Sequence, residues 1–292
     1  MIHEIFNDDI KISIFSKGAE LCSIQKQQPI KIEYMWSGDK DVWERRSPNL
    51  FPITGRLKEE RYEIDGKSYS MPIHGFAKES EFEVMEKTKS KIIFLLNSNK
   101  KTKEIYPFDF QFFITYELKK HTILITYKVI NVSISTMFFS IGAHPGFKCP
   151  LFNEELLEDY FIEFEHEEIA QAYRHTETEL LSKKPSKLPL INGKYLPLTK
   201  DLFNEGVYVL KSPRSNWVAL KNKNNNHSVK ISFKDFPYFC LWSKPNTPFI
   251  CFEPWYGVTD IEGSSFDITK REGIIRLEKN DHFNCQYNIT IE

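Results

Sequence analysis

Phe110-Gln-Phe-Phe-Ile-Thr-Tyr-Glu-Leu118 places an apolar side chain at every even-numbered position. Residues 122–131 continue the alternation with Ile123, Ile125, Tyr127 and Val129. A period of two puts alternate side chains on one face of a β-strand. Because only three residues, 119–121, separate the two runs, we predict an antiparallel pair of strands with one face in the core.

The same period recurs along most of the chain. Asp65-Gly66, between alternating residues 62–64 and 67–69, supplies the positive φ angles of a type I′ hairpin turn. Helical periodicity is scarce, and we expect only short helices at 153–157 and 177–181. The pattern is typical of an all-β protein built as a large antiparallel sandwich. Further short strands are predicted near 10–15, 19–26, 81–87, 91–98, 161–166, 217–222, 228–233, 238–243, 249–253 and 282–291.

No composition change divides the chain into parts. The most linker-like segment, residues 180–199, is rich in Lys, Pro and Leu, and we expect it to cross the surface between strands. All-β folds often run well past 200 residues as one unit. We therefore predict a single domain over residues 1–292.

Composition excludes several classes of partner. The 292 residues carry 39 Lys+Arg against 40 Asp+Glu, so no basic field is available for nucleic acid or an anionic membrane. Only 12 residues are glycine, too few for a dinucleotide-binding or P-loop architecture. The 24 Phe and 13 Tyr favour strands and also offer planar faces to a ligand.

We expect no signal peptide and no membrane span from the residue pattern. The first ten residues, MIHEIFNDDI, carry acids where a signal peptide would be basic. No segment approaches the ~18–20 apolar residues that a membrane span requires. The five cysteines include no CxxC pair, which favours free thiols over a disulfide framework or a zinc site. We expect a cytoplasmic protein.

The common catalytic motifs are absent too: GxGxxG, GxxxxGK[ST], GxSxG and HExxH do not occur. His166-Glu-Glu168 begins like the last of these, but position 170 is alanine, and we interpret the segment as solvated surface. Cys251 lies in an apolar run and is expected to be a small buried hydrophobe. Acid–base chemistry by side chains on a small molecule remains.

Three segments place a titratable group beside Gly or Pro at the end of an apolar run, as a sheet does when it presents a group at its rim. His74 could instead cap a turn, His144 could be held extended by the following proline, and Arg56 could be a surface cation. Glu253 is the strongest candidate, because a buried carboxylate without a partner is costly. The segments are Asn49-Leu-Phe-Pro-Ile-Thr-Gly-Arg56 with Met71-Pro-Ile-His-Gly-Phe76, Phe139-Ser-Ile-Gly-Ala-His-Pro-Gly-Phe147, and Phe249-Ile-Cys-Phe-Glu-Pro-Trp-Tyr-Gly257.

Together these segments resemble the aldose 1-epimerase (galactose mutarotase) family, in its branch similar to the LacX proteins. The resemblance also covers Met35-Trp-Ser-Gly38, Ala77 after the HGF triplet, Tyr106-Pro-Phe108 and Leu241-Trp-Ser-Lys-Pro245, in family order. It implies a β-supersandwich of large twisted antiparallel sheets. It also implies cofactor-free interconversion of the α and β anomers of an aldose, without a metal.

The resemblance also implies roles for individual residues. Glu253 would be the base and His144 the acid, while His74 would hydrogen-bond near the ring oxygen and the C1 hydroxyl. Arg56 would orient sugar hydroxyls. Relatives commonly hold ring hydroxyls with an aspartate; this sequence offers Glu205, or else Asp201, and we take Glu205. Rings that could stack on a sugar, or could simply fill the core, are Trp242 and Trp255, with Trp36 and Tyr256.

Other functions stay open at this point. A glycoside hydrolase normally needs two carboxylates flanking the bond, whereas the evident set here is two histidines and one glutamate. A sugar-binding or regulatory module could keep the fold without turnover, although binding alone needs no acid–base pair. A hexose 6-phosphate also stays open as the substrate, and no obvious cluster of Arg and Lys near the motifs settles the choice. We expect a small-molecule aldose as the partner of a monomer or weak homodimer, with no nucleic acid or membrane.

Overall fold

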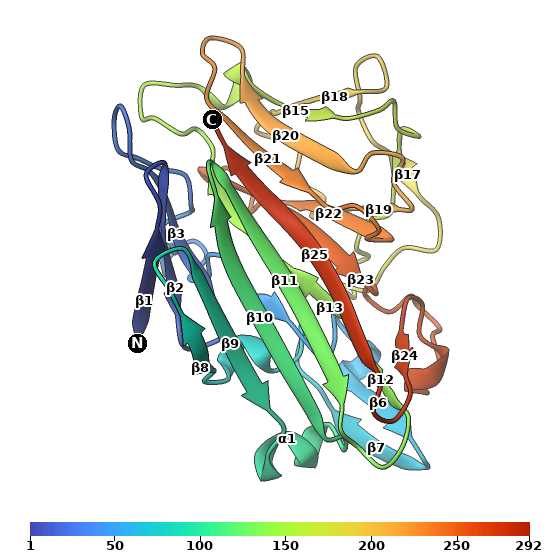
Figure 1. Ribbon diagram of the computed structural model, residues 1–292. Coiled ribbons are helices and arrows are strands. Elements are labelled where there is room, and N and C mark those ends of the chain that lie inside the picture. The colour runs from blue at the N-terminus through green and yellow to red at the C-terminus, as the bar shows by residue number, and fades with distance from the viewer.

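The computed structural model describes residues 1–292 as a stack of antiparallel sheets with few helices (Figure 1). The predicted fold class, an all-β supersandwich, is confirmed. The largest sheet has nine strands, and the C-terminal strand β25 runs through its middle, between β21 and β11. In spatial order its strands are β18 (Tyr195–Pro197), β15 (Tyr160–Phe164), β20 (Trp217–Asn222), β21 (Ser228–Ser232), β25 (His282–Ile291), β11 (Thr122–Asn131), β10 (Phe110–Lys119), β9 (Lys91–Asn97) and β8 (Glu83–Lys87).

The predicted hairpin lies next to β25 in this sheet. Strands β10 and β11 pair over their whole length, from Phe110 opposite Asn131 to Lys119 opposite Thr122. The even-numbered side chains of β10 and the odd-numbered ones of β11 are buried, as the alternation predicted. Each such aliphatic or aromatic side chain contributes about 1.5–3 kcal/mol when it leaves water. These faces belong to one core of 66 buried residues.

A second, six-stranded sheet covers that core from the other side. Phe51, next to β5, packs on Phe112 of β10 with ring centroids 4.8 Å apart, and Tyr256 of β23 packs on Phe283 of β25 at 5.1 Å. Its strands, in order, are β19 (Tyr208–Lys211), β22 (Tyr238–Trp242), β23 (Phe249–Tyr256), β13 (Ile141–Ala143) and β5 (Asn49–Leu50), and β14 (Gly146–Lys148) also pairs with β23.

The remaining elements are short and flank these two sheets. The one α-helix, α1 (Lys100–Ile105), starts at an Asn99 cap, and no helix is long and apolar enough to span a bilayer. The other strands are β1 (Ile2–Phe6), β2 (Ile10–Phe15), β3 (Leu21–Lys26) and β4 (Ile32–Glu33) in a four-stranded sheet, and the pairs β6 (Arg61–Ile64) with β7 (Lys67–Ser70), β12 (Met137–Phe139) with β24 (Ile275–Leu277), and β16 (Gln171–Ala172) with β17 (Ser186–Lys187). The 3₁₀ turns are Lys58–Glu60, Ala77–Glu79, Leu157–Asp159 and Ile268–Lys270.

The predicted strands are confirmed, but the predicted helices are not. The Asp65-Gly66 hairpin is confirmed as β6–β7, and every predicted strand position carries a strand. The two predicted helices are wrong: residues 177–181 form a turn, and 153–157 form a turn that leads into a 3₁₀ turn. Segment 180–199 is more than a surface connection, because it contains β17 and β18 and buries several leucines. The single-domain organisation stays a prediction, supported by the one large core.

Candidate active site

The outer face of the six-stranded sheet, turned away from the main core, carries the candidate site. Along β23, Ile250 and Phe252 point into the core, so the alternation of the strand sends Cys251, Glu253 and Trp255 to the opposite face. Glu253 is therefore presented by a rigid central strand and is only 1% exposed.

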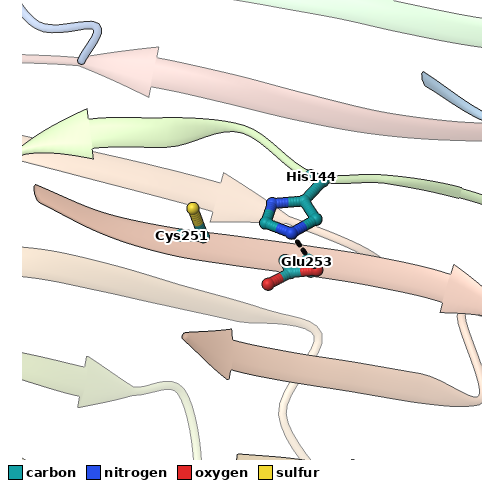
Figure 2. Close-up of side chains that lie close together, drawn as sticks. All are labelled: His144, Cys251 and Glu253. Atoms are coloured by element: carbon teal, nitrogen blue, oxygen red, sulfur yellow. Dashed lines mark ion pairs between the residues drawn. The ribbon is translucent and has the colours of Figure 1, made fainter. Parts of the chain in front are cut away.

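His144 reaches the same face from the neighbouring strands. Strands β13 and β14 both pair with β23, with Gly142 opposite Trp255 and Gly146 opposite Cys251. His144 and Pro145 connect them and so cross β23 at the level of Glu253. His144 Nε2 lies 3.3 Å from Glu253 Oε2, and Figure 2 shows the imidazole over the strand with this contact dashed. The side chain of His144 is 9% exposed.

Burial controls the protonation of this pair. Removal from water raises the pKa of Glu253 well above its ordinary value and lowers the pKa of His144, because each charged form loses its hydration. The two groups are in direct contact and titrate as a unit. Taken singly, both shifts favour the uncharged carboxyl and imidazole, whereas the 3.3 Å contact favours the two charged forms together. One group is ready to give a proton while the other is ready to accept one.

Cys251 lies beside the pair (Figure 2). One possible ligand atom from each of His144, Cys251 and Glu253 lies within 4.8 Å of the other two, so this is where a metal ion would find its donors. Burial raises the pKa of the Cys251 thiol well above its ordinary value, which keeps the sulfur protonated and a poor ligand. Cys251 packs with Trp36 and Phe249 as the small buried hydrophobe that the sequence predicted.

His74 is held in one tautomer by its backbone surroundings. The Gly55 N–H donates to His74 Nδ1 at 3.1 Å, and the His74 N–H donates back to the Gly55 carbonyl at 2.8 Å. Burial, followed by the proximity of His144 and Lys78, lowers the pKa of His74 well below its ordinary value. The ring is therefore neutral, with its proton on Nε2 as a hydrogen-bond donor.

Glycine is required where these loops meet. Gly55 has φ +67°, and a Cβ there would lie 2.2 Å from the hydroxyl oxygen of Thr259. Gly75 has φ +71°, and a Cβ there would lie 2.3 Å from the carbonyl oxygen of Phe51. Both contacts are shorter than any real Cβ contact, so a larger residue would push apart the loops that carry Arg56 and His74.

A cleft of about 590 Å³ opens over this face, within the usual range for small-molecule sites. All seven candidate residues line it: Arg56, His74, His144, Glu205, Trp242, Glu253 and Trp255. Glu205 lies at the rim, 83% exposed and 3.8 Å from Arg174 Nη2. Asp201 is not part of the lining and instead accepts a hydrogen bond from Asn204.

The four aromatic candidates separate into two groups. Trp242 and Trp255 line the cleft, and Trp255 is fixed because its indole N–H donates to the Ala143 carbonyl at 3.1 Å. Trp36 and Tyr256 do not line it: Trp36 is buried beside Phe249, and Tyr256 packs half-buried against the main core.

The structure adds residues that sequence reasoning missed. Trp43 stacks on the His144 ring at 5.0 Å and so forms one wall of the cleft. Its only signal was a tryptophan in an otherwise polar segment. The cleft also contains three cations that sequence reasoning did not group together, and a third histidine. The additional residues that the argument below uses are Arg45, Lys78, His175, Glu179 and Thr259.

Comparison with known proteins places this arrangement in a family. Residues 1–267 match the family model described as aldose 1-epimerase. The chain belongs to the aldose 1-epimerase family. Among its relatives in this family, the chromosomal protein LacX of Lactococcus lactis subsp. lactis is 30% identical over 300 residues, which cover 100% of this chain and 99% of that protein.

Solved structures extend the aldose 1-epimerase comparison to three dimensions. A galactose mutarotase related enzyme from Lactobacillus acidophilus has a TM-score of 0.94 at 32% identity, covering 100% of this chain and 97% of that one. A galactose mutarotase-like protein from Lactobacillus casei ATCC 334 has a TM-score of 0.94 at 29% identity, with 100% of both chains covered. A putative aldose 1-epimerase from Escherichia coli K12 shares the fold, with a TM-score of 0.79 at 15% identity and 100% and 99% of the two chains covered.

Proposed function

We propose that this chain is an aldose 1-epimerase that interconverts the α and β anomers of a hexose by acid–base ring opening. The observation that carries the proposal is the contact of 3.3 Å between His144 Nε2 and Glu253 Oε2 at the base of a sugar-sized cleft. The pair places a carboxyl group beside an imidazole, and the reaction needs one proton donor and one proton acceptor acting together.

The proton balance of the reaction follows from this pair. In the charged form of the pair, with Glu253 as carboxylate and His144 as imidazolium, Glu253 removes the proton of the C1 hydroxyl of the bound sugar and His144 protonates its ring oxygen. The bond between C1 and the ring oxygen breaks and C1 becomes a carbonyl. After rotation about the C1–C2 bond, His144 takes the proton back from the C5 hydroxyl and Glu253 returns one to the C1 oxygen. The ring closes on the other face, and no proton is gained or lost.

The other residues in the cleft suit the binding of a neutral ring. His74 offers its Nε2–H to the ring oxygen or the C1 hydroxyl, which lie within one bond of the reacting centre. The Arg56 Nε is buried without a partner and can donate to a sugar hydroxyl. Trp242 supplies an aromatic face, which commonly packs on the apolar side of a sugar.

Two observations bear on the alternatives. Glu253 is the only buried carboxylate in the lining, since Glu179 and Glu205 are exposed at the rim, and this disfavours a glycosidase with two flanking acids. The two arginines of the cleft are already engaged: Arg56 with Glu60 and Glu179, and Arg45 with Glu79 and Glu20. Arginines paired in this way favour an uncharged aldose over a hexose 6-phosphate.

The proposal is tested by anomer-exchange NMR with purified protein and a panel of aldoses and hexose 6-phosphates. We expect at least one free aldose to exchange faster than in buffer, and the matching 6-phosphate to exchange more slowly than that aldose. Heat-unfolded protein at the same concentration is the control. If no sugar exchanges faster than in buffer, the enzyme assignment is wrong; a sugar that binds without exchanging would support the binding-module alternative.

A further inference from the structure

Lys78 is a half-buried lysine of the cleft lining whose ammonium group turns back toward the protein. Its Nζ donates to the carbonyl of Ile73 at 2.9 Å and to the carbonyl of Gly75 at 2.9 Å. These carbonyls belong to the residues on either side of His74. The neighbouring Glu79 pairs with Lys17 and Arg45 rather than with Lys78. The ammonium group of Lys78 therefore binds the turn that carries His74.

That turn needs support because His74 adopts a strained backbone conformation. Its φ is +64°, in the left-handed region that a residue with a Cβ enters at a cost of about 1–2 kcal/mol. Such a conformation persists only where the surroundings fix it. Two of the fixing contacts run to Gly55, and the other two are the donations from Lys78 to the flanking carbonyls.

The charge of Lys78 has a second effect on the same ring. His74 is faced by His144, Lys78, His175 and Arg56, all of them cations or groups that become cations. An ammonium beside a buried imidazole disfavours its protonation. Lys78 therefore helps to keep His74 neutral, which preserves the Nε2–H as a donor and leaves Nδ1 free to accept from Gly55.

We propose that Lys78 is a positioning residue of this active site, which clamps the His74 turn from both sides and holds the His74 imidazole in its neutral Nε2–H tautomer. This inference rests on the proposed function for its effect on turnover, whereas its effect on the imidazole does not. The proposal adds to the site a residue that does not touch the sugar but fixes the position and tautomer of His74.

Two variants separate the clamp from general stability. Lys78→Met keeps the aliphatic stem but removes both donors and the charge, whereas Lys78→Arg keeps donors and charge. Lys211→Met is the matched control, because Lys211 is a half-buried lysine on β19 that pairs with Glu272 away from His74. We expect Lys78→Met to lower kcat about 10- to 100-fold with a small change in KM, because a misplacement near 1 Å can cost that much.

The same variant is expected to move the acid side of the kcat profile to higher pH, since His74 becomes easier to protonate. Lys78→Arg should stay within a few-fold of the unmodified enzyme, and Lys211→Met should change neither kcat nor the profile. Loss of stability in Lys78→Met with kcat and profile unchanged would reduce Lys78 to a structural residue and overturn the inference.

Imidazole NMR tests the inference without turnover. In the unmodified protein the ring ¹⁵N shifts of His74 should report a protonated Nε2 and an accepting Nδ1. In Lys78→Met the His74 ring should titrate at a higher pH and populate both tautomers, while Lys211→Met leaves it unchanged. If the protein does not accelerate anomer exchange but still shows this change, the clamp is supported and the proposed function is wrong. If the protein is active but Lys78→Met does not change the titration or tautomer of His74, the proposed function is supported and the clamp is wrong.

Discussion

Replacing Glu253 with glutamine is expected to slow anomer exchange by roughly 10²–10⁴-fold, the range by which a positioned acid or base accelerates proton transfer. Glutamine keeps the size of the side chain but neither accepts nor carries the proton. His144→Asn should have a similar effect, because His144 supplies the other half of the transfer. The two residues act together in one proton transfer, so the double variant should be little slower than the slower single variant.

The measurement is the exchange rate by NMR at saturating sugar, with near-UV circular dichroism as the check on folding. Glu205→Gln is the matched control, since Glu205 lies at the rim of the same cleft and is exposed. We expect this control to keep kcat within a few-fold while KM rises modestly. A Glu253→Gln variant as fast as Glu205→Gln would refute the assignment of Glu253 as the base.

Replacing Arg271 with methionine is expected to destabilise the protein by about 3–5 kcal/mol, because it strands a buried carboxylate. Arg271 Nε donates to Asp260 Oδ1 at 2.6 Å, and the two side chains are 2% and 6% exposed. Arg271 Nη2 also donates to the Val258 carbonyl, while Asp260 Oδ2 accepts from the Lys58 N–H. These contacts hold the segment on either side of Thr259, which lines the cleft next to Gly55.

Urea unfolding measures this change in the free energy of unfolding. Arg276→Met is the control: Arg276 and its partner Glu278 are 68% and 54% exposed, and an exposed pair of this kind adds little to stability. Adding Asp260→Asn to Arg271→Met removes the stranded charge and should restore part of the loss. If Arg271→Met costs no more than Arg276→Met, the buried pair does not stabilise this loop.

The sequence predicts the long strands well because the alternation of apolar and polar residues determines which of their faces is buried. In β10 and β11 the alternation extends over ten residues and one face is fully buried, so local pattern and tertiary packing agree. Strands of two or three residues, such as β13 and β14, have too few positions to show a period. They exist because β23 offers them backbone partners, which is a property of the assembled sheet.

The site could be predicted in part for a similar reason. Glu253, His144 and His74 each follow or interrupt an apolar run beside Gly or Pro, so the sequence marks them one by one. Lys78 and Trp43 carry no such mark, since their roles depend on which carbonyls and rings the fold brings near. The sequence could not decide between Glu205 and Asp201, because successive turns lie between residue 199 and β19. In turns, the direction of a side chain does not follow from its position in the sequence.

The two predicted helices failed because short polar segments near proline and leucine imitate helical spacing without supporting it. The helix that does form, α1, has a clear signal in retrospect. Asn99 caps the backbone N–H of Thr102, the Thr102 hydroxyl accepts from the N–H of Asn99, and Pro107 follows the last turn. Reciprocal capping therefore marks this helix in the sequence, whereas six residues are too few to show a helical period.

The position of β25 has a consequence for the order in which the protein is made. This strand joins β21 on one side and β11 on the other, so the nine-stranded sheet remains two unconnected halves until residues 282–291 have been synthesised. Each half exposes a strand edge and apolar side chains of the core during that time. Ribosome-bound nascent chains that end before residue 282 should therefore be protease-sensitive and dependent on chaperones, and protection should appear in one step when β25 closes the sheet.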